Sequence, residues 1–296
     1  MKSPVLSILF LLISVTLLAV PNDFRFRHFS VEDGLSSNSV RAIMQDKYGF
    51  LWIGTEEGLN RYDGIMIKSY SICPQAAGKY ISSLYGTKKN IWIGTDEGIY
   101  IYAYATETFT YFDLTTPNNV RITSIVNHIL QDKDGNLWFS TNGQGLFRYN
   151  LSKNYLEQYE FTSAFGIVAS TMADSDNQIW ALTNQGESGV YKLNKAENKF
   201  EPFGLLYNAG NHHSQALAML EDSEQTLWLG TWECGLQKID KYTRQTTTYL
   251  HPTDGKGVTH IHSLMEYAPH QLLIGSDDGL LLFNTLTEEY KLFTEN

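Results

Sequence analysis

The sequence has little of what disulfide-rich, nucleic-acid-binding or disordered proteins need. Its 296 residues include only two cysteines, Cys73 and Cys234, too few for a disulfide framework, and we expect both to be buried free thiols. Basic residues number 22 against 32 acidic ones, and the net charge of −10 argues against nucleic acid as a partner. Hydrophobic residues make up 43% of the chain and charged ones only 18%, which excludes a disordered chain because burying so much apolar surface offsets the entropy lost on ordering.

Long hydrophobic runs are also missing, except for one at the N-terminus. Lys2 is followed by an uncharged, mostly apolar stretch from Ser3 to Val20. As a helix its apolar part would be about 25 Å long, shorter than the ~30 Å hydrocarbon core of a bilayer. We therefore predict a signal peptide at residues 1–20, with an uncleaved N-terminal anchor as the alternative because Leu17 disfavours cleavage after Ala19. The folded part, residues 21–296, is expected outside the cytoplasm.

What the sequence does contain is a repeat. Aromatic residues make up 13% of the chain and glycine occurs 23 times, a composition that favours short strands and tight turns. One pattern recurs six times, with its anchor at Trp52, Trp92, Trp138, Trp180, Trp228 and Leu273. The mean spacing of about 44 residues matches a four-stranded propeller blade.

Four short strands are expected in each repeat. In the first repeat they are Val40 to Gln45, Leu51 to Thr55, Leu59 to Asp63 and Met66 to Tyr70. The second of these is apolar without alternation, which is typical of a strand buried on both faces, and no repeat has the 3.6-residue period of a helix. We predict an all-β protein, a β-propeller of six complete four-stranded blades. The repeats lie near residues 36–78, 79–119, 120–163, 164–212, 213–256 and 257–296.

The stretch before the first repeat bears on how the ring closes. Phe24 to Phe29 is similar to the expected fourth strands, and the sixth repeat already has its own fourth strand at Tyr290 to Phe293. We therefore expect Phe24 to Phe29 to be the outermost strand of a missing seventh blade, so that the ring is an incomplete seven-bladed one. A closed six-bladed ring is the alternative. An open ring would expose two blade faces that promote association.

Residues 33–64, DGLSSNSVRAIMQDKYGFLWIGTEEGLNRYDG, closely resemble the two-component regulator propeller repeat, and residues 91–100 and 137–149 are further clear copies. The resemblance implies seven-bladed rings and the periplasmic sensor domain of a hybrid two-component histidine kinase, typical of gut Bacteroidetes. It implies an oligosaccharide ligand, no cofactor, and a full-length protein that is a homodimer in the inner membrane. The further blades and the kinase of that system do not appear in this sequence, so we expect no enzymatic activity from this chain.

The candidate ligand-binding residues gather at one rim of the predicted ring. This upper rim, as we call it, carries the turns between second and third strands and the connections between blades. Amides, carboxylates and an exposed aromatic residue there suit sugars, whose hydroxyls pair with polar groups while their C–H faces stack on rings. The candidates are Trp232, Glu233, Asn38, Asn142, Gln144, Tyr80 and His260. Trp232 is the sharpest of them, since it replaces an acidic residue at its turn, and simple packing against the neighbouring turn is its alternative.

The opposite rim, here called the lower rim, carries the turns between first and second strands. Asp46, Asp132 and Asp222 recur there in near-identical turns, which indicates a shared structural role. We therefore expect ligand at the rim bearing Trp232, Asn38 and Asn142, because variable loops on a constant scaffold usually carry recognition.

Two other chemistries are considered for the histidines. His260 and His262 lie on one side of a strand and are spaced to chelate a metal, but no further ligand is fixed by spacing, so exposure to solvent or to the channel is the expected state and no metal site is assigned. Streptogramin lyase-like propellers have similar repeats, and in such an enzyme His128, His260 or His262 would lie at the ring centre. The alternatives to a sensor are thus a lyase-like enzyme and a protein-binding platform, which the fold alone does not separate.

Overall fold

The computed structural model of the chain describes residues 24–73, 79–161, 166–183, 189–205, 215–250 and 257–294. The predicted signal segment at residues 1–20, the turn Gln185 to Glu187 and the pair His212 and His213 lie outside these ranges. The one helix within them is the short 3₁₀-helix η1 (Val31–Asp33). No helix in these ranges is long and apolar enough to cross a bilayer.

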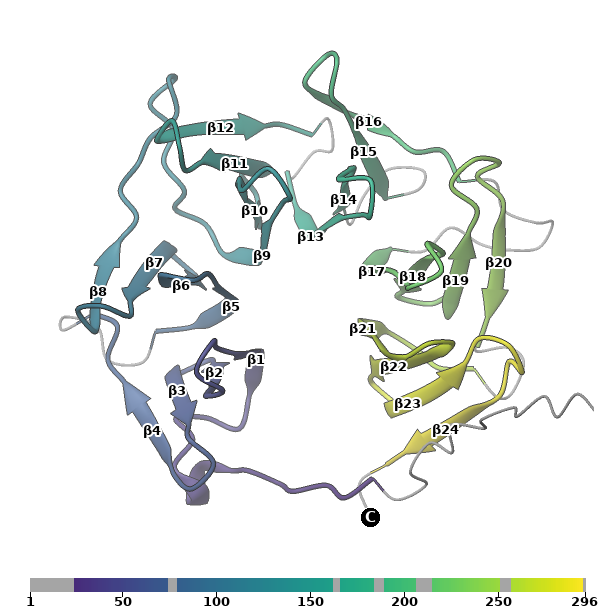
Figure 1. The fold of residues 1–296 in the computed structure, drawn as a ribbon, viewed down its shortest axis with the longest axis horizontal. Helices are drawn as coiled ribbons and strands as arrows, with labels where there is room; N and C mark the ends of the chain where they lie inside the picture. Colours follow the sequence, from purple (N-terminus) through teal and green to yellow (C-terminus); the bar gives the residue numbers. More distant parts are fainter. Residues whose placement is uncertain are drawn as a thin grey trace, which may run out of the picture.

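The described residues form six four-stranded antiparallel sheets, arranged as the blades of a propeller around a central axis (Figure 1). The prediction of six complete blades is confirmed. Blade 1 consists of β1 (Val40–Gln45), β2 (Leu51–Thr55), β3 (Gly58–Tyr62) and β4 (Ile67–Tyr70). Blade 2 consists of β5 (Ile81–Gly86), β6 (Asn90–Thr95), β7 (Gly98–Ala103) and β8 (Thr108–Tyr111). Blade 3 consists of β9 (Val126–Gln131), β10 (Leu137–Thr141), β11 (Leu146–Asn150) and β12 (Tyr155–Tyr159). Blade 4 consists of β13 (Val168–Ala173), β14 (Ile179–Thr183), β15 (Val190–Asn194) and β16 (Lys199–Pro202). Blade 5 consists of β17 (Ala216–Glu221), β18 (Leu227–Thr231), β19 (Leu236–Ile239) and β20 (Thr246–Tyr249). Blade 6 consists of β21 (Ile261–Ala268), β22 (Gln271–Ser276), β23 (Gly279–Asn284) and β24 (Tyr290–Phe293).

The tryptophan anchors hold successive blades together. All five are buried as predicted, with exposed fractions between 1% and 3%. Trp52 packs on Ile81, Ile91 and Tyr102 of blade 2, and each of the other four likewise packs on the blade that follows it. Each second strand that carries a tryptophan is therefore covered by the adjacent blades, which explains its unbroken apolar sequence.

A carboxylate fixes most of these indoles. Asp46 accepts a hydrogen bond from Trp52 Nε1 at 2.7 Å and also from two backbone N–H groups of its own turn. The same indole bond recurs at Trp138 with Asp132, at Trp180 with Asp174 and at Trp228 with Asp222. The structural role expected of the recurring aspartates is thus confirmed, and the structure adds Asp174, whose turn the sequence comparison did not bring out.

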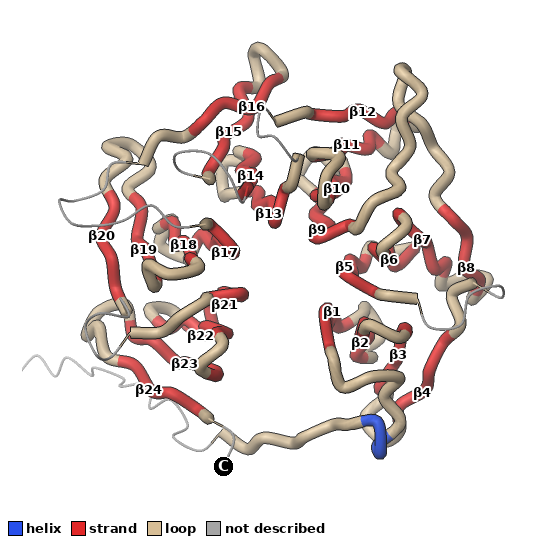
Figure 2. The backbone as a smooth tube through the Cα atoms, turned by 180° about the vertical axis from the view of Figure 1, so that it is seen from behind, coloured by secondary structure: helices blue, strands red, loops and turns tan. Residues whose placement is uncertain are grey.

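The ring is open between blades 6 and 1 (Figures 1 and 2). The inner strands pack in the order β1, β5, β9, β13, β17, β21, and five apolar cores lie between the six blades in the described part of the chain. The anchor of blade 6, Leu273, faces the gap and is only partly buried. On the other side of the gap Ile43 is 65% exposed, whereas its equivalent Ile129 in blade 3 is 2% exposed.

The N-terminal segment corrects one prediction. Residues 24–30 are extended but form no strand, because the described residues place no strand beside them to pair with. The segment nevertheless runs along the outside of the gap from blade 6 to blade 1 (Figure 1). Phe24 packs on Tyr267 and Phe293 of blade 6, and Phe29 packs on Tyr62 of blade 1 with ring centroids 4.8 Å apart.

The two cysteines are both free thiols, as expected. Cys234 is buried in blade 5, but Cys73 is only partly buried, which corrects the expectation for that residue. The difference follows from position, since Cys73 lies in the connection that leaves β4 on the outside of blade 1.

Removing one anchor should test the packing between blades. Trp52→Ala is expected to lower the free energy of unfolding by about 3–5 kcal/mol through the cavity that it leaves. Chemical denaturation measures the loss. Trp232→Ala is the matched control, because Trp232 is 39% exposed and its removal leaves no closed cavity. An unfolding free energy unchanged by Trp52→Ala would show that Trp52 is not part of a core.

The gap generates a second prediction. Ile43 and Met265 face it from opposite sides and are 65% and 54% exposed, so the protein should associate as its concentration rises. Replacing both by lysine should reduce association, measured by sedimentation velocity, without lowering the thermal midpoint. Ile129→Lys is the control that should destabilise the fold, because Ile129 is buried. Association that persists in the double variant would contradict this role of the gap.

Candidate functional site

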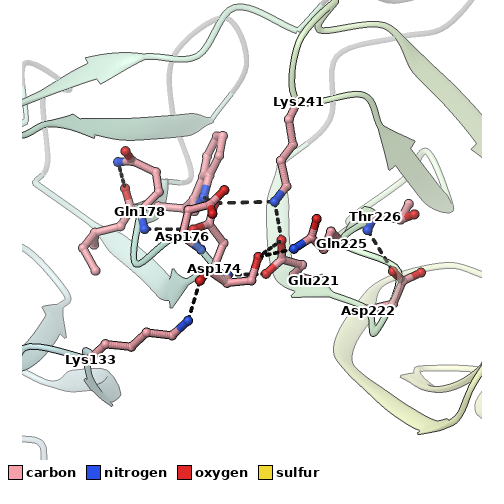
Figure 3. Close-up of polar contacts among 12 residues, drawn as sticks. Lys133, Asp174, Asp176, Gln178, Glu221, Asp222, Gln225, Thr226 and Lys241 are labelled. Carbon is pink, nitrogen blue, oxygen red and sulfur yellow. Dashed lines mark hydrogen bonds and ion pairs between the residues drawn. The ribbon is translucent and has the colours of Figure 1, made fainter.

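The lower rim is occupied by contacts that hold blades together. Ser175 in blade 4 donates hydrogen bonds to Glu221 of blade 5, and Ser223 in blade 5 donates to Glu266 of blade 6. Figure 3 shows the Lys241 ammonium group between Asp174 and Glu221, with which it forms ion pairs. Both carboxylates are nearly buried, so the lysine neutralises charge inside the blade contact. These side chains are engaged in the scaffold, which leaves the upper rim as the more variable surface.

The upper rim brings four candidate side chains together where blades 5 and 6 meet. The Trp232 ring packs on the His260 ring with centroids 3.9 Å apart and planes inclined by 40°. His260 Nδ1 and His262 Nε2 each bond to one oxygen of Asp277, the latter at 2.8 Å. Trp232 thus packs against the connection that enters blade 6, not against the neighbouring turn, and it remains 39% exposed.

The backbone builds this cluster from two segments. The Trp232 carbonyl accepts the His260 N–H at 3.0 Å, which ties the turn of blade 5 to the connection entering blade 6. His260 has a φ of 49°, a left-handed conformation that is uncommon for a residue other than glycine. Asp277 lies in the turn between β22 and β23, directly beneath the two imidazoles. The two histidines do face one side, as their spacing predicted.

The charge of Asp277 is stabilised by its neighbours. Hydrogen bonds from His262 and then from His260 lower the pKa of the carboxyl group below its ordinary value of 3.8. Asp277 is therefore ionised over the physiological range and accepts from both imidazoles. Asp277 follows His262 by 15 residues, and only the packing of the second-to-third turn on the connection brings it beside the two histidines.

The other predicted residues lie elsewhere on the upper rim. Asn38 Oδ1 accepts the Val31 N–H at 2.9 Å and so holds the loop around η1. Gln144 Oε1 accepts from the backbone N–H groups of Thr123 and Ser124, and its Nε2 donates to the Arg121 carbonyl, so its amide links blade 3 to the connection before it. Both amides are engaged within the protein, which reduces their capacity to bind a ligand.

Asn142, Glu233 and Tyr80 complete the set. The Asn142 side chain is exposed in the turn of blade 3, and Glu233 is exposed directly after Trp232. Tyr80 is partly buried beside Arg41, whose guanidinium lies 6.0 Å from its ring centre. The structure therefore brings together Trp232, Glu233 and His260, while Asn38, Tyr80, Asn142 and Gln144 lie at other blades of the same rim.

His128, the remaining candidate histidine, lies on an inner strand and not in the cluster around Asp277. His128 is on β9, with Nδ1 3.4 Å from Thr171 Oγ1 of blade 4. Desolvation lowers its pKa to about 4, so its imidazole is neutral at physiological pH. Within the described ranges, no three His, Cys, Asp or Glu side chains are arranged to hold a metal ion.

Comparison with known proteins agrees with the repeat. The family described as two component regulator propeller matches residues 34–57 and 120–143, so the resemblance found in the sequence is confirmed. A histidine kinase of Formosa agariphila is 46% identical over 68 residues. That match covers 23% of this chain and 5% of the kinase, so the chain spans a small part of its relative's length.

Solved structures share the architecture. The extracellular domains of two hybrid two-component systems of B. thetaiotaomicron superpose with TM-scores of 0.75 and 0.71 at 23% and 24% identity. They cover 91% and 87% of this chain, which spans about a third of their own length, 36% and 33%. A streptogramin B lyase superposes with a TM-score of 0.66 at 17% identity, covering 88% of this chain and 86% of its own. At these identities the structures show the fold.

The cluster at Asp277 predicts a pH effect. Because the folded pKa lies below 3.8, the ionised carboxylate contributes stability above about pH 4, and this contribution is lost as pH falls through the folded pKa. Asp277→Asn should therefore lower the thermal midpoint at pH 6. The difference from the unsubstituted protein should disappear as the pH is lowered below the folded pKa of Asp277. Asp96→Asn, at the equivalent turn of blade 2, is the control and should show little difference throughout. A difference that does not change with pH would contradict the assignment.

Proposed function

We propose that this chain is the extracytoplasmic ligand-sensing propeller of a hybrid two-component regulator, and that its ligand is an oligosaccharide released from a glycan. The observation that carries the proposal is the combination of the regulator propeller repeat with the exposed cluster of Trp232, His260, His262 and Asp277. In this proposal the propeller lies in the periplasm, and ligand binding on its upper rim changes the activity of a histidine kinase in a membrane-bound dimer.

The chemistry of the cluster supports a sugar as the ligand. The exposed part of Trp232 suits the C–H face of a pyranose ring, and the remaining ring nitrogens of His260 and His262 together with the Asp277 oxygens offer acceptors for hydroxyl groups beside it. The carboxylates of Asp277 and Glu233 disfavour an acidic sugar, which favours a neutral or weakly basic oligosaccharide. A shallow rim buries little of a ligand, so a modest affinity is expected.

A seventh blade is part of the proposal. Ten residues separate Phe29 from Val40, as they separate Tyr70 from Ile81 between blades 1 and 2. Phe29 packs on Tyr62 as Phe112 packs on the equivalent Tyr149, with centroids 5.0 Å apart. The N-terminal segment thus lies where the outer strand of a preceding blade would lie.

The glycines of the second strands also support a seventh blade. A Cβ at Gly54 or Gly230 would lie 2.5 Å from an isoleucine on the inner strand of the following blade. A Cβ at Gly275 would meet only Ser263 of its own blade. Blade 6 therefore carries the glycine that close approach of a following blade requires, and we propose that three further strands fill the gap.

A streptogramin lyase-like enzyme is the second candidate. The superposition with such a lyase covers most of both chains, and His260, His262 and Asp277 are the residues near the axis that offer imidazole and carboxylate groups. The regulator propeller repeat, present twice in the family match, favours the sensor. A protein-binding platform remains the third class, and the test below separates it because such a platform binds no sugar.

The sensor proposal is tested by calorimetry with a panel of plant and host glycan fragments. One fragment should bind, and Trp232→Ala combined with Asn142→Ala should weaken it at least about tenfold, or 1.4 kcal/mol. Tyr242→Ala is the matched control, since Tyr242 is an aromatic residue that is 92% exposed away from the upper rim, and it should leave the affinity unchanged.

Two results would count against the proposal. A sugar that binds the double variant as well as the unsubstituted protein would show that the upper rim is not the site. Failure of every glycan to bind, with turnover of a cyclic depsipeptide antibiotic by the same preparation, would favour the lyase instead.

A further inference from the structure

Blade 2 departs from the pattern that the other tryptophan-bearing blades follow. In blades 1, 3, 4 and 5 the indole binds an aspartate and also lies beneath a cationic side chain from the third strand. Those cations, at 5.4 to 5.9 Å from the ring centres, are Arg61, Arg148, Lys192 and Lys238. In blade 2 the aspartate position holds Thr87 and the cation position holds Ile101, which pairs with Trp92 in the sheet. A local rule broken at one repeat is where function is expected.

The departure coincides with a groove between blades 2 and 3. Its volume is about 410 Å³, within the range of small-molecule sites. Trp92, Tyr111, Phe112 and Tyr149 line it together with Asn90 and Asn154. The corresponding groove between blades 3 and 4 measures about 180 Å³ and is lined by Arg148 and Asp132, the two groups that blade 2 lacks. The groove between blades 4 and 5 is larger, about 560 Å³, but Lys192, Lys195, Lys241 and Arg244 line it. The groove between blades 2 and 3 is therefore distinguished by its mostly uncharged, aromatic lining rather than by its volume.

Trp92 also carries an unsatisfied polar atom. Its Nε1 is covered by protein atoms and has no hydrogen-bond partner among the described residues. Thr87 is too short to replace aspartate, and its hydroxyl bonds instead to the backbone of Asn90. A buried donor without an acceptor costs about 1–3 kcal/mol, so the indole of blade 2 lacks a stabilising hydrogen bond that the indoles of blades 1, 3, 4 and 5 have.

The groove carries no unpaired charge. Asp113, the one ionisable carboxylate that lines it, forms an ion pair with Arg121 at 2.7 Å. Burial raises the pKa of Tyr111 and of Tyr149, so both phenols are neutral. The Tyr149 hydroxyl donates to Asn154 Oδ1 at 2.8 Å, which leaves the Asn154 amide nitrogen to donate outward. A charged ligand would find no counter-ion here.

We propose that this groove is a second ligand site, distinct from the upper rim, that takes one uncharged sugar unit. The partly exposed ring of Tyr149 provides a face for the C–H surface of the sugar, and the amides of Asn90 and Asn154 bind its hydroxyls. The site recognises a neutral sugar by shape and hydrogen bonding rather than by charge.

The test restores the pattern of the other blades in the full chain. Ile101→Arg places in the groove the side chain that blades 1 and 3 carry, and Thr87→Asp gives Trp92 its missing acceptor. The probes are glucose, galactose, xylose and arabinose, with glucuronate as the charged comparison. The readout is the indole N–H resonance of Trp92, identified by its loss in Trp92→Phe. At least one neutral sugar should shift it with millimolar affinity, and glucuronate should bind at least about tenfold more weakly.

The variants decide the assignment. Ile101→Arg should abolish the sugar-induced shift of the Trp92 resonance and leave the thermal midpoint unchanged or raised. Lys238→Arg in blade 5 should leave that shift intact. Trp232→Ala should also leave it intact, so failure of the upper rim and failure of this groove are distinguishable. Absence of a Trp92 shift with every neutral sugar, or a shift that survives Ile101→Arg, would overturn the proposal.

Discussion

Each blade of this protein depends on the next blade to bury its second strand. A strand that is apolar on both faces cannot be covered by its own sheet, and the tryptophan at its centre adds a large ring with one polar atom. Trp138 shows both requirements, since its ring packs against blade 4 while its N–H is accepted by Asp132 within its own blade. Stability is therefore held at the contacts between blades, as in other repeat proteins. Where a contact is missing, as beyond Leu273, a strand with the same pattern is left partly exposed.

This dependence separates the two rims. The aspartates that orient the indoles lie in the lower-rim turns, and the ion pair of Lys241 with Asp174 joins the lower rims of blades 5 and 4. A change there disturbs the packing of two blades at once. The upper-rim turns have no indole to orient, so they are free to differ, and one of them presents Trp232 beside His260. Blade 2 is the exception on the lower side, because Thr87 leaves its indole without an acceptor.

The open side of the ring has the features of a place for another blade. Ile43 and Met265 face it from either side, and the N-terminal segment crosses its outer edge. The chain spans about a third of the solved extracellular domains whose fold it shares.

The sequence by itself determined the repeat, the four strands of each blade and the buried anchors, because these follow from local patterns. An apolar run around a tryptophan and turn residues at fixed intervals require no knowledge of what lies opposite. It also marked Trp232 as unusual by position. Only the tertiary structure decided that His260 and His262 share Asp277, that Gln144 is engaged by its neighbouring connection, and that Trp92 lacks an acceptor. These facts depend on which turn of one blade meets which segment of the next. The same reason explains why the segment from Phe24 to Phe29 is no strand: its sequence suits one, but a strand exists only where a partner supplies the hydrogen bonds.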